Sequence, residues 1–147
     1  MLDGLFVAPA LAAVGEALHS AHADEGAIAV IGNAKLASAL AKQRSTLAVG
    51  LSARAAKKHP GALDDLSSVE PRSLAAVIAV DVALDDGWQA SLEAWTRVVR
   101  DGGAIVLLDR GHAPEASRRA LCGGLTELEQ RRAGRTIVTS GLVSHLV

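Results

Sequence analysis

Residues 73–109 read SLAAVIAVDVALDDGWQASLEAWTRVVRDGGAIVLLD. The apolar run from Leu74 to Val80 is typical of a strand that is buried on both faces, as in parallel sheets. After it, apolar side chains recur on one face of a predicted helix, which Asp101-Gly102-Gly103 is expected to end. The side chains on that face are Leu84, Trp88, Leu92, Trp95 and Val99. Residues 104–108 form a second predicted buried strand, so the stretch predicts a strand–helix–strand unit of an α/β fold.

The same alternation extends to both sides of this unit. Upstream, short apolar strands are predicted at residues 27–31 and 46–50. An N-terminal helix is predicted from apolar residues at helical spacing between Val7 and Leu18, and residues 24–26 are expected to end it. The other predicted helices cover residues 34–42, 52–59 and 114–121, with Ser52 as a helix N-cap. Residues 125–132 and 135–147 form a final predicted hairpin. We therefore predict one domain over residues 1–147, with an N-terminal helix in residues 1–25 and a three-layer, doubly wound core in residues 26–147.

The composition argues against several classes of protein. The chain of 147 residues is half apolar with a net charge of −1, and its basic and acidic residues are scattered along its length. Without a Lys/Arg stripe and with few aromatic residues, nucleic-acid binding is not expected. The single cysteine, Cys122, excludes an internal disulfide and is expected in the core or on a helix face. The histidines have no spacing with carboxylates that would indicate a metal site.

The N-terminus and the hydropathy predict a cytoplasmic protein. The apolar run near the start has no preceding Lys or Arg, Asp3 stands where positive charge would be needed, and Glu16 interrupts it. These features argue against a secretory signal peptide. No apolar stretch approaches the length of a membrane span, so no membrane contact is expected.

The turn after the central helix suggests a family. Residues 97–103 read RVVRDGG, which resembles the Arg-Val-Leu-(Arg/Lys)-Pro-Gly-Gly turn before the fifth strand of class I S-adenosylmethionine-dependent methyltransferases, with Asp101 in place of proline. Gly124-Leu125-Thr126 resembles a strand start near the C-terminus of that family, and Thr139-Ser140-Gly141 resembles its last strand. The resemblance covers about residues 26–147. It implies a Rossmann-like sheet of about seven strands in the order 3-2-1-4-5-7-6, with the last strand antiparallel.

The resemblance also implies where the cofactor would bind, and several of those positions are altered. Val30 stands where the family has an acid, and Gly32 is followed by Asn33 and non-glycine residues in a loop that looks shortened. Gly50 occupies the position of the ribose-binding acid. Ala62 falls on the acid that binds adenine, although Asp64 or Asp65 could replace it if the register differs by a few residues.

The remaining polar residues of the predicted crevice carry weaker signals. The cofactor positions implied by the resemblance are Gly32, Asn33, Gly50, Asp64 and Asp81. Asp81 and His112 follow the two central strands, where this fold often keeps functional groups, but a turn acid and a loop histidine are the simpler interpretations. Ser52 and Ser140 have no evident base. We therefore assign no catalytic residue and no metal ligand.

Three hypotheses follow from the altered site. The first is a non-catalytic, methyltransferase-like module that binds no cofactor and works through a protein partner or a second copy, as a homodimer. Phe6, Val143 and Leu146 are the apolar residues expected at such an interface. The second is an S-adenosylmethionine-dependent methyltransferase with an atypical pocket that uses Asp64, Asp65 and Asp81. The third is a domain that binds another nucleotide or metabolite in the same crevice.

Overall fold

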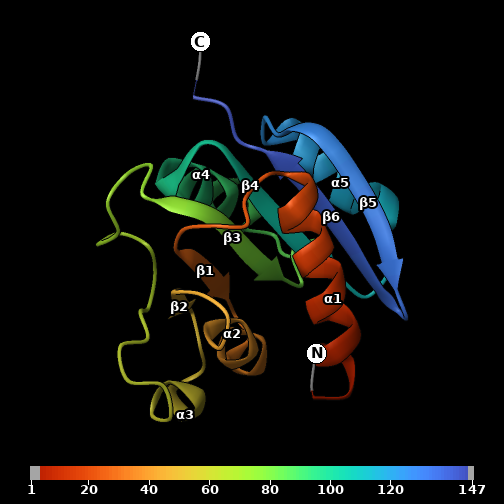
Figure 1. Cartoon of the computed structure of the whole chain (residues 1–147). Helices are drawn as coiled ribbons and strands as arrows, with labels where there is room; N and C mark the ends of the chain where they lie inside the picture. Colours follow the sequence, from red (N-terminus) through yellow and green to blue (C-terminus); the bar gives the residue numbers. More distant parts are fainter. Residues whose placement is uncertain (1–3, 146–147) are drawn as a thin grey trace.

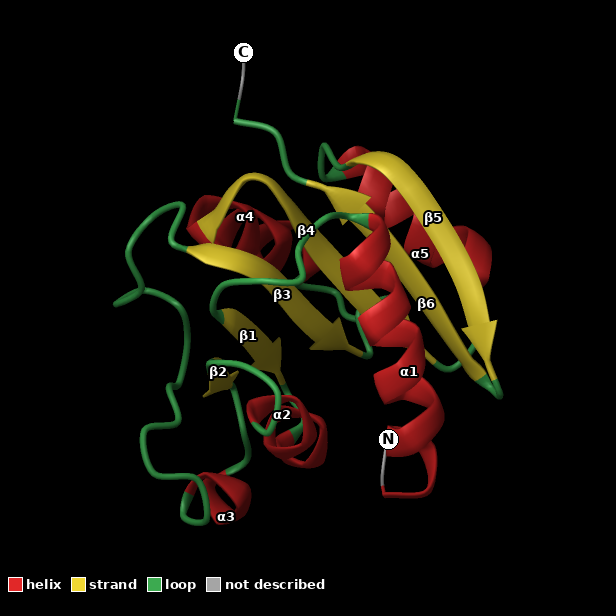
Figure 2. Ribbon diagram, in the orientation of Figure 1, coloured by secondary structure: helices red, strands yellow, loops and turns green. Residues whose placement is uncertain are grey.

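The computed structural model describes residues 4–145, and side chains from Ala10 onward. Helices and strands alternate along most of the chain, and the last two strands form a hairpin (Figure 1, Figure 2). The elements in chain order are α1 (Gly4–Ser20), β1 (Ile28–Ile31), α2 (Ala34–Ala41), β2 (Thr46–Val49), α3 (Ala53–Ala56), β3 (Leu74–Val80), α4 (Trp88–Val98), β4 (Val99–Asp109), α5 (Ala113–Cys122), β5 (Thr126–Ala133) and β6 (Thr136–Leu142).

The described part of the chain forms one six-stranded sheet in the order β2-β1-β3-β4-β6-β5. The first four strands are parallel, whereas β6 runs antiparallel to both β4 and β5. Leu74–Val80 is the predicted strand β3, and it lies in the interior of the sheet, as expected. This order corresponds to the predicted order 3-2-1-4-5-7-6 without strand 3, which was expected at the edge beside β2.

The missing edge strand, strand 3 of the expected order, is reduced to a single contact. Leu63 forms an isolated parallel bridge with Val49 at the free edge of β2. The chain then turns away, because the Asp65 carboxylate accepts hydrogen bonds from the backbone and the hydroxyl of Ser67. Such an Asx turn competes with strand pairing.

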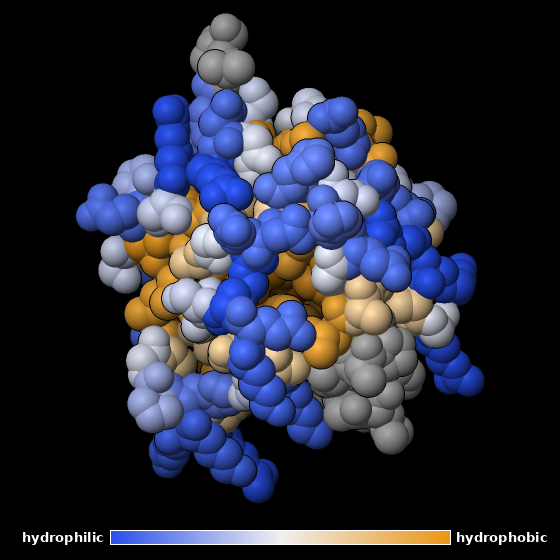
Figure 3. Space-filling view, viewed as in Figure 1, coloured by the Kyte–Doolittle hydropathy of each residue, from blue (hydrophilic) through white to orange (hydrophobic). Residues whose placement is uncertain are grey.

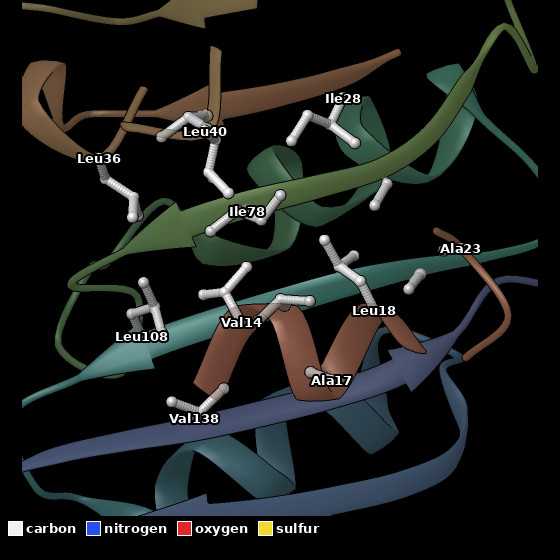
Figure 4. Close-up of a cluster of buried hydrophobic side chains, with 14 of the residues drawn as sticks. Val14, Ala17, Leu18, Ala23, Ile28, Leu36, Leu40, Ile78, Leu108 and Val138 are labelled. Atoms are coloured by element: carbon white, nitrogen blue, oxygen red, sulfur yellow. The ribbon is translucent and has the colours of Figure 1, made fainter. Parts of the chain in front are cut away.

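The sheet lies between two helical layers. Helices α1 and α2 cover one face and α4 and α5 the other (Figure 1). Along β3, Ile78 packs toward α1 and α2, while Val77 packs toward α4. Figure 4 shows Val14 and Leu18 of α1 beside Ile78, Leu108 and Val138. Both faces of the central strands are therefore buried, which accounts for their continuous apolar sequence.

Both expected ends of the helix after β3 are wrong. Helix α4 ends at Val98, and Gly102 and Gly103 lie inside β4 rather than in a turn before it. A Cβ at Gly103 would lie 2.6 Å from the carbonyl oxygen of Ala75, so the second glycine permits close strand packing. Leu84 precedes α4 and is 71% exposed, so it does not belong to the buried face of that helix.

The expected apolar interface also needs correction. Val143 is 1% exposed and packs in the core, where its backbone exchanges two hydrogen bonds of 2.8 Å with Gly102 and Gly103. The Phe6 side chain and Leu146 lie outside the described residues. Cys122 is exposed at the end of α5 and is not a core residue. A lipid bilayer could not be crossed by any helix among residues 4–145, because none combines the required length and hydrophobicity.

Candidate functional site

The carboxyl ends of the parallel strands β1, β2, β3 and β4 meet at one edge of the sheet. In open α/β sheets this edge forms the ligand-binding crevice. Two cavities lie here, one of about 320 Å³ beside β1 and β2 and one of about 90 Å³ beside β3 and β4. The candidate site therefore has a larger part and a smaller part.

The connection from β1 to α2 is tight. Val30 is fully buried in the core, and only Gly32 and Asn33 separate β1 from α2. Gly32 has φ +84°, a conformation that favours glycine. The Asn33 side-chain oxygen accepts a hydrogen bond of 2.9 Å from the backbone N–H of Leu36, which caps the helix. This loop thus uses its polar side chain to start a helix.

The end of β2 offers space but no acid. Gly50 is exposed with φ +66°, and its N–H donates a 2.9 Å hydrogen bond to the carbonyl of Leu63. A Cβ at Gly50 would be 3.8 Å from Ile31 and 3.9 Å from the carbonyl oxygen of Asp64, which is ordinary contact. The position therefore has space for a side chain, but its left-handed backbone would strain any residue other than glycine.

The larger cavity is lined by two aspartates from the segment after β2. Its wall is formed by residues of β1, β2, α4 and the following loops: Ile31, Val49, Gly50, Asp64, Asp65, Leu66, Ala90, Ser91, Ala94 and Trp95. Asp64 directly follows Leu63, which forms the isolated bridge at the place of the missing edge strand. The hydrogen bonds from Ser67 lower the pKa of Asp65. Ala62 packs against the core on the face of the sheet that α1 and α2 cover, so Asp64 rather than Ala62 lies beside this cavity.

The smaller cavity gathers charged groups at the ends of β3 and β4. It is lined by Asp81, Leu84, Asp109, Arg110 and His112. Asp81 has φ +57° and donates its N–H to the carbonyl of Leu108 at 2.8 Å. His112 has φ +57° at the N-cap of α5. Left-handed backbone at non-glycine residues is uncommon and often marks functional sites.

Asp109 is a candidate functional residue that the sequence analysis did not identify. It is 2% exposed, and its Oδ1 accepts a 2.8 Å hydrogen bond from the N–H of Ala83. Within the described residues its Oδ2 is buried without a hydrogen-bond partner. Burial raises the pKa of Asp109, and the Asp81 carboxylate acts in the same direction, while the backbone hydrogen bonds and His112 oppose them. Its one sequence signal is a lone acid at the end of an apolar strand.

The structure brings together some of the predicted residues and separates others. Gly50 and Asp64 share the larger cavity, whereas Asp81 and His112 share the smaller one. Gly32 and Asn33 lie in the loop after β1 and line neither cavity. The Ser52 hydroxyl caps α3. Within the described residues, no group of three or more His, Cys, Asp or Glu is placed to hold a metal ion.

The sequence has no match among models of known protein families, and a search of curated proteins finds no relative. The structure, in contrast, resembles many solved structures.

Three of these structures illustrate the similarity. The ribosomal protein L11 methylase from Lactobacillus delbrueckii subsp. bulgaricus has a TM-score of 0.72 at 16% identity, over 99% of this chain and 81% of that one. A complex of the Haloferax volcanii Trm112 methyltransferase activator with a putative methyltransferase gives 0.67 at 14% identity, over 94% of this chain and 96% of the matched one. The T. thermophilus 16S rRNA methyltransferase RsmC, in complex with AdoMet and guanosine, gives 0.60 at 19% identity, over 82% of this chain.

This chain spans only 36% of the RsmC chain. At such low identities the similarity is one of fold, and it confirms the predicted class I methyltransferase-like Rossmann fold.

Proposed function

We propose that this chain is a methyltransferase-fold domain that has lost S-adenosylmethionine binding and acts as a non-catalytic binding or assembly module. The observation that carries the proposal is the loop between β1 and α2, together with the residues of β1 and α2 that flank it. There a fully buried valine and a helix-capping asparagine stand where the resembling family holds the amino-acid part of the cofactor.

The residues of this loop do not fit that cofactor. The side chains of Val30 and Leu36 are both buried in the core, so neither position offers a polar group to a ligand. The Asn33 side chain already bonds one of the N–H groups at the start of α2, which a ligand carboxylate would otherwise contact. Each Cβ in the loop also obstructs close approach of a ligand to the backbone.

The ribose position supports the same conclusion. Gly50 has no carboxylate to accept hydrogen bonds from two ribose hydroxyls. Each hydrogen bond to a charged group contributes about 1.5–3 kcal/mol, and about 1.4 kcal/mol changes a dissociation constant tenfold. Loss of the pair therefore weakens binding by about a hundredfold or more.

Isothermal titration calorimetry with S-adenosylmethionine and S-adenosylhomocysteine tests the loss of binding. We expect dissociation constants weaker than about 1 mM for both compounds. A constant below about 10 μM for either one refutes the proposal. An Asp64→Ala variant is the matched control: if binding does occur in the larger cavity, this change weakens it, whereas heat of dilution is unaffected.

A module of this kind needs a partner, and we propose a protein or a second copy of the chain. Among the described residues, the large apolar side chains that are most exposed are Leu84, at 71%, and Leu121, at 61%. One of the resembling structures is a complex between a methyltransferase activator and a putative methyltransferase, which is a precedent for protein partners on this fold. Sedimentation analysis tests self-association.

A second candidate function is an S-adenosylmethionine-dependent methyltransferase with an atypical pocket. The observation in its favour is that acids line both cavities of the crevice: Asp64 and Asp65 in the larger one, Asp81 and Asp109 in the smaller one. In this alternative Asp64 would hold the adenosine part, and the Asp81 carboxylate would accept a proton from the substrate. Tight binding in the calorimetric experiment above would favour this candidate.

A further inference from the structure

Charge is segregated in this chain in a way that its net charge of −1 hides. Residues 26–63 contain six Lys and Arg and no Asp or Glu, whereas the rest of the chain contains nine Lys and Arg and sixteen Asp and Glu. This segment forms β1, α2, β2 and α3. Because β2 and β1 are the first two strands of the sheet, the segment makes one end of the molecule basic. The scattered charge seen along the whole sequence is thus uneven in space.

A groove of about 520 Å³ lies between α2 and α3 at this basic end. Its polar lining includes four cations: Lys35 in the first turn of α2, Lys42 directly after α2, Arg54 in α3, and Lys58 in the turn that follows α3. The apolar part of the wall is formed by Ala34, Ala39 and Ala55. The Ser38 hydroxyl of α2 and the His59 ring form a 3.3 Å hydrogen bond across the groove. The corresponding region in the lower part of Figure 3 is largely hydrophilic.

The four cations are exposed, and none of them is paired with a carboxylate in the described part of the chain. Three arginines elsewhere are paired with carboxylates: Arg118 and Arg119 both bond to Glu115, and Arg131 bonds to Glu16 and Glu129. Four like charges around one groove repel one another, and a bound anion would relieve this repulsion.

We propose that the groove between α2 and α3 binds a small molecule that carries more than one phosphate group. Ammonium and guanidinium groups are the side chains that bind phosphate oxygens best, and the Ser38 hydroxyl adds a donor. Lys35 and Lys42 are seven residues apart on one helix, about 10 Å along its axis, so cations stand at both ends of the groove. A cavity of this size accommodates a nucleotide-sized ligand.

The lining favours a small phosphorylated molecule over a nucleic acid. No Phe, Tyr or Trp lines the groove, and single-stranded nucleic acids depend mainly on such side chains for base stacking. The groove also lies away from the crevice, on the other side of α2 from the sheet-facing residues Leu36 and Leu40. The proposal is therefore independent of whether the crevice binds S-adenosylmethionine.

Calorimetry at low ionic strength with inorganic tripolyphosphate, ATP and citrate tests the proposal. The variant is Lys35→Ala/Lys58→Ala, which removes one cation from each side of the groove. The matched control is Arg132→Ala/Arg135→Ala, which removes the same charge from exposed positions on and beside β5. Melting curves establish that both variants stay folded.

We expect tripolyphosphate and ATP to bind the wild type, with affinity that falls as salt is added. The groove variant should lose about tenfold in affinity and the control variant less than about twofold. Equal losses in the two variants, no binding of tripolyphosphate, or citrate binding as tight as tripolyphosphate would each overturn the proposal. Tighter binding of a short single-stranded RNA than of ATP would also overturn it, in favour of a nucleic-acid site.

Discussion

The carboxylate of Asp109, at the end of β4, accepts a 2.8 Å hydrogen bond from the backbone N–H of Ala83, in the segment after β3. Both residues are buried. This contact fixes the turn that carries Asp81 and brings the charged groups of the smaller cavity together. A single carboxylate therefore supports the floor of the crevice and leaves one oxygen directed to no partner among the described residues.

The first prediction concerns that carboxylate. Asp109→Ala leaves the Ala83 N–H buried without an acceptor and should lower the free energy of unfolding by about 1–3 kcal/mol. Asp109→Asn keeps an oxygen in the same place and removes the buried charge, so it should be neutral or stabilising at about pH 7. Urea denaturation measures both changes. A larger loss for Asp109→Asn than for Asp109→Ala would show that the ionised carboxylate itself stabilises the fold.

The same residue predicts a dependence on pH. Burial raises the pKa of Asp109 in the folded state above its unfolded value, so the folded protein binds the proton more tightly. Its contribution to stability is therefore greatest below the unfolded pKa and is lost as the pH rises through the folded pKa. The stability of the wild type relative to Asp109→Asn should thus fall as the pH rises above about 4, the ordinary pKa of an aspartate. A difference between the two proteins that stays constant as the pH rises contradicts the raised pKa.

A second prediction contrasts two glycines. A Cβ at Gly103 would lie 2.6 Å from the Ala75 carbonyl oxygen and from Val99, so Gly103→Ala should cost about 1–3 kcal/mol of stability or more. Gly15 lies in α1 with nothing within 4 Å of an added Cβ, so Gly15→Ala should stabilise the protein by about 0.5–1 kcal/mol. Thermal melts of the two variants should shift in opposite directions. A stabilising Gly103→Ala would mean that β3 and β4 are not packed as closely as described.

The sequence predicted those features that depend on local pattern. The apolar run Leu74–Val80 identified β3 with its bounds, and Ser52 was identified as an N-cap. The errors depend on contacts between distant segments. Gly102 and Gly103 were predicted to end the helix, whereas they lie in β4 at a register shift in its pairing with β3, where both bond to the backbone of Val143.

The candidate site shows the same division. Glycine and valine at the expected acid positions are visible in the sequence, but the placement of Asp64 beside the larger cavity depends on the Val49–Leu63 bridge. Asp109 was missed because an acid after an apolar strand looks like any strand end. It is buried and bonds to the N–H of Ala83, 26 residues earlier in the chain, a contact that no local pattern specifies.

A third prediction separates the loss of one cofactor contact from the loss of several. Gly50→Asp adds a carboxylate where the family has one, and the surrounding space allows it. Aspartate tolerates the left-handed backbone at φ +66° better than most residues, so the variant should fold with a modest loss of stability. S-adenosylmethionine binding should remain weaker than about 100 μM, because Val30 and the Asn33 cap are unchanged. A dissociation constant near 10 μM or below in calorimetry would mean that the weak binding of the wild type is caused by Gly50 alone.

The last prediction concerns self-association as a homodimer, and it compares variants of exposed apolar residues with a variant of a buried one. Burial of an exposed leucine at an interface contributes about 1.5–3 kcal/mol, so its replacement by serine should weaken a dimer by about tenfold to a hundredfold. We expect the wild type to sediment as a dimer at about 100 μM, a concentration well above a dissociation constant of about 10 μM. Leu84→Ser or Leu121→Ser should shift it toward monomer without lowering the melting temperature, because both side chains are exposed in the single chain.

Val143→Ser is the contrasting variant: its side chain is 1% exposed, so it should lower the melting temperature through loss of core packing. Wild-type protein that sediments as a monomer at this concentration would remove the homodimer and leave a different protein as the partner of the module. A dimer that neither leucine variant weakens would instead place the interface on another surface of the chain.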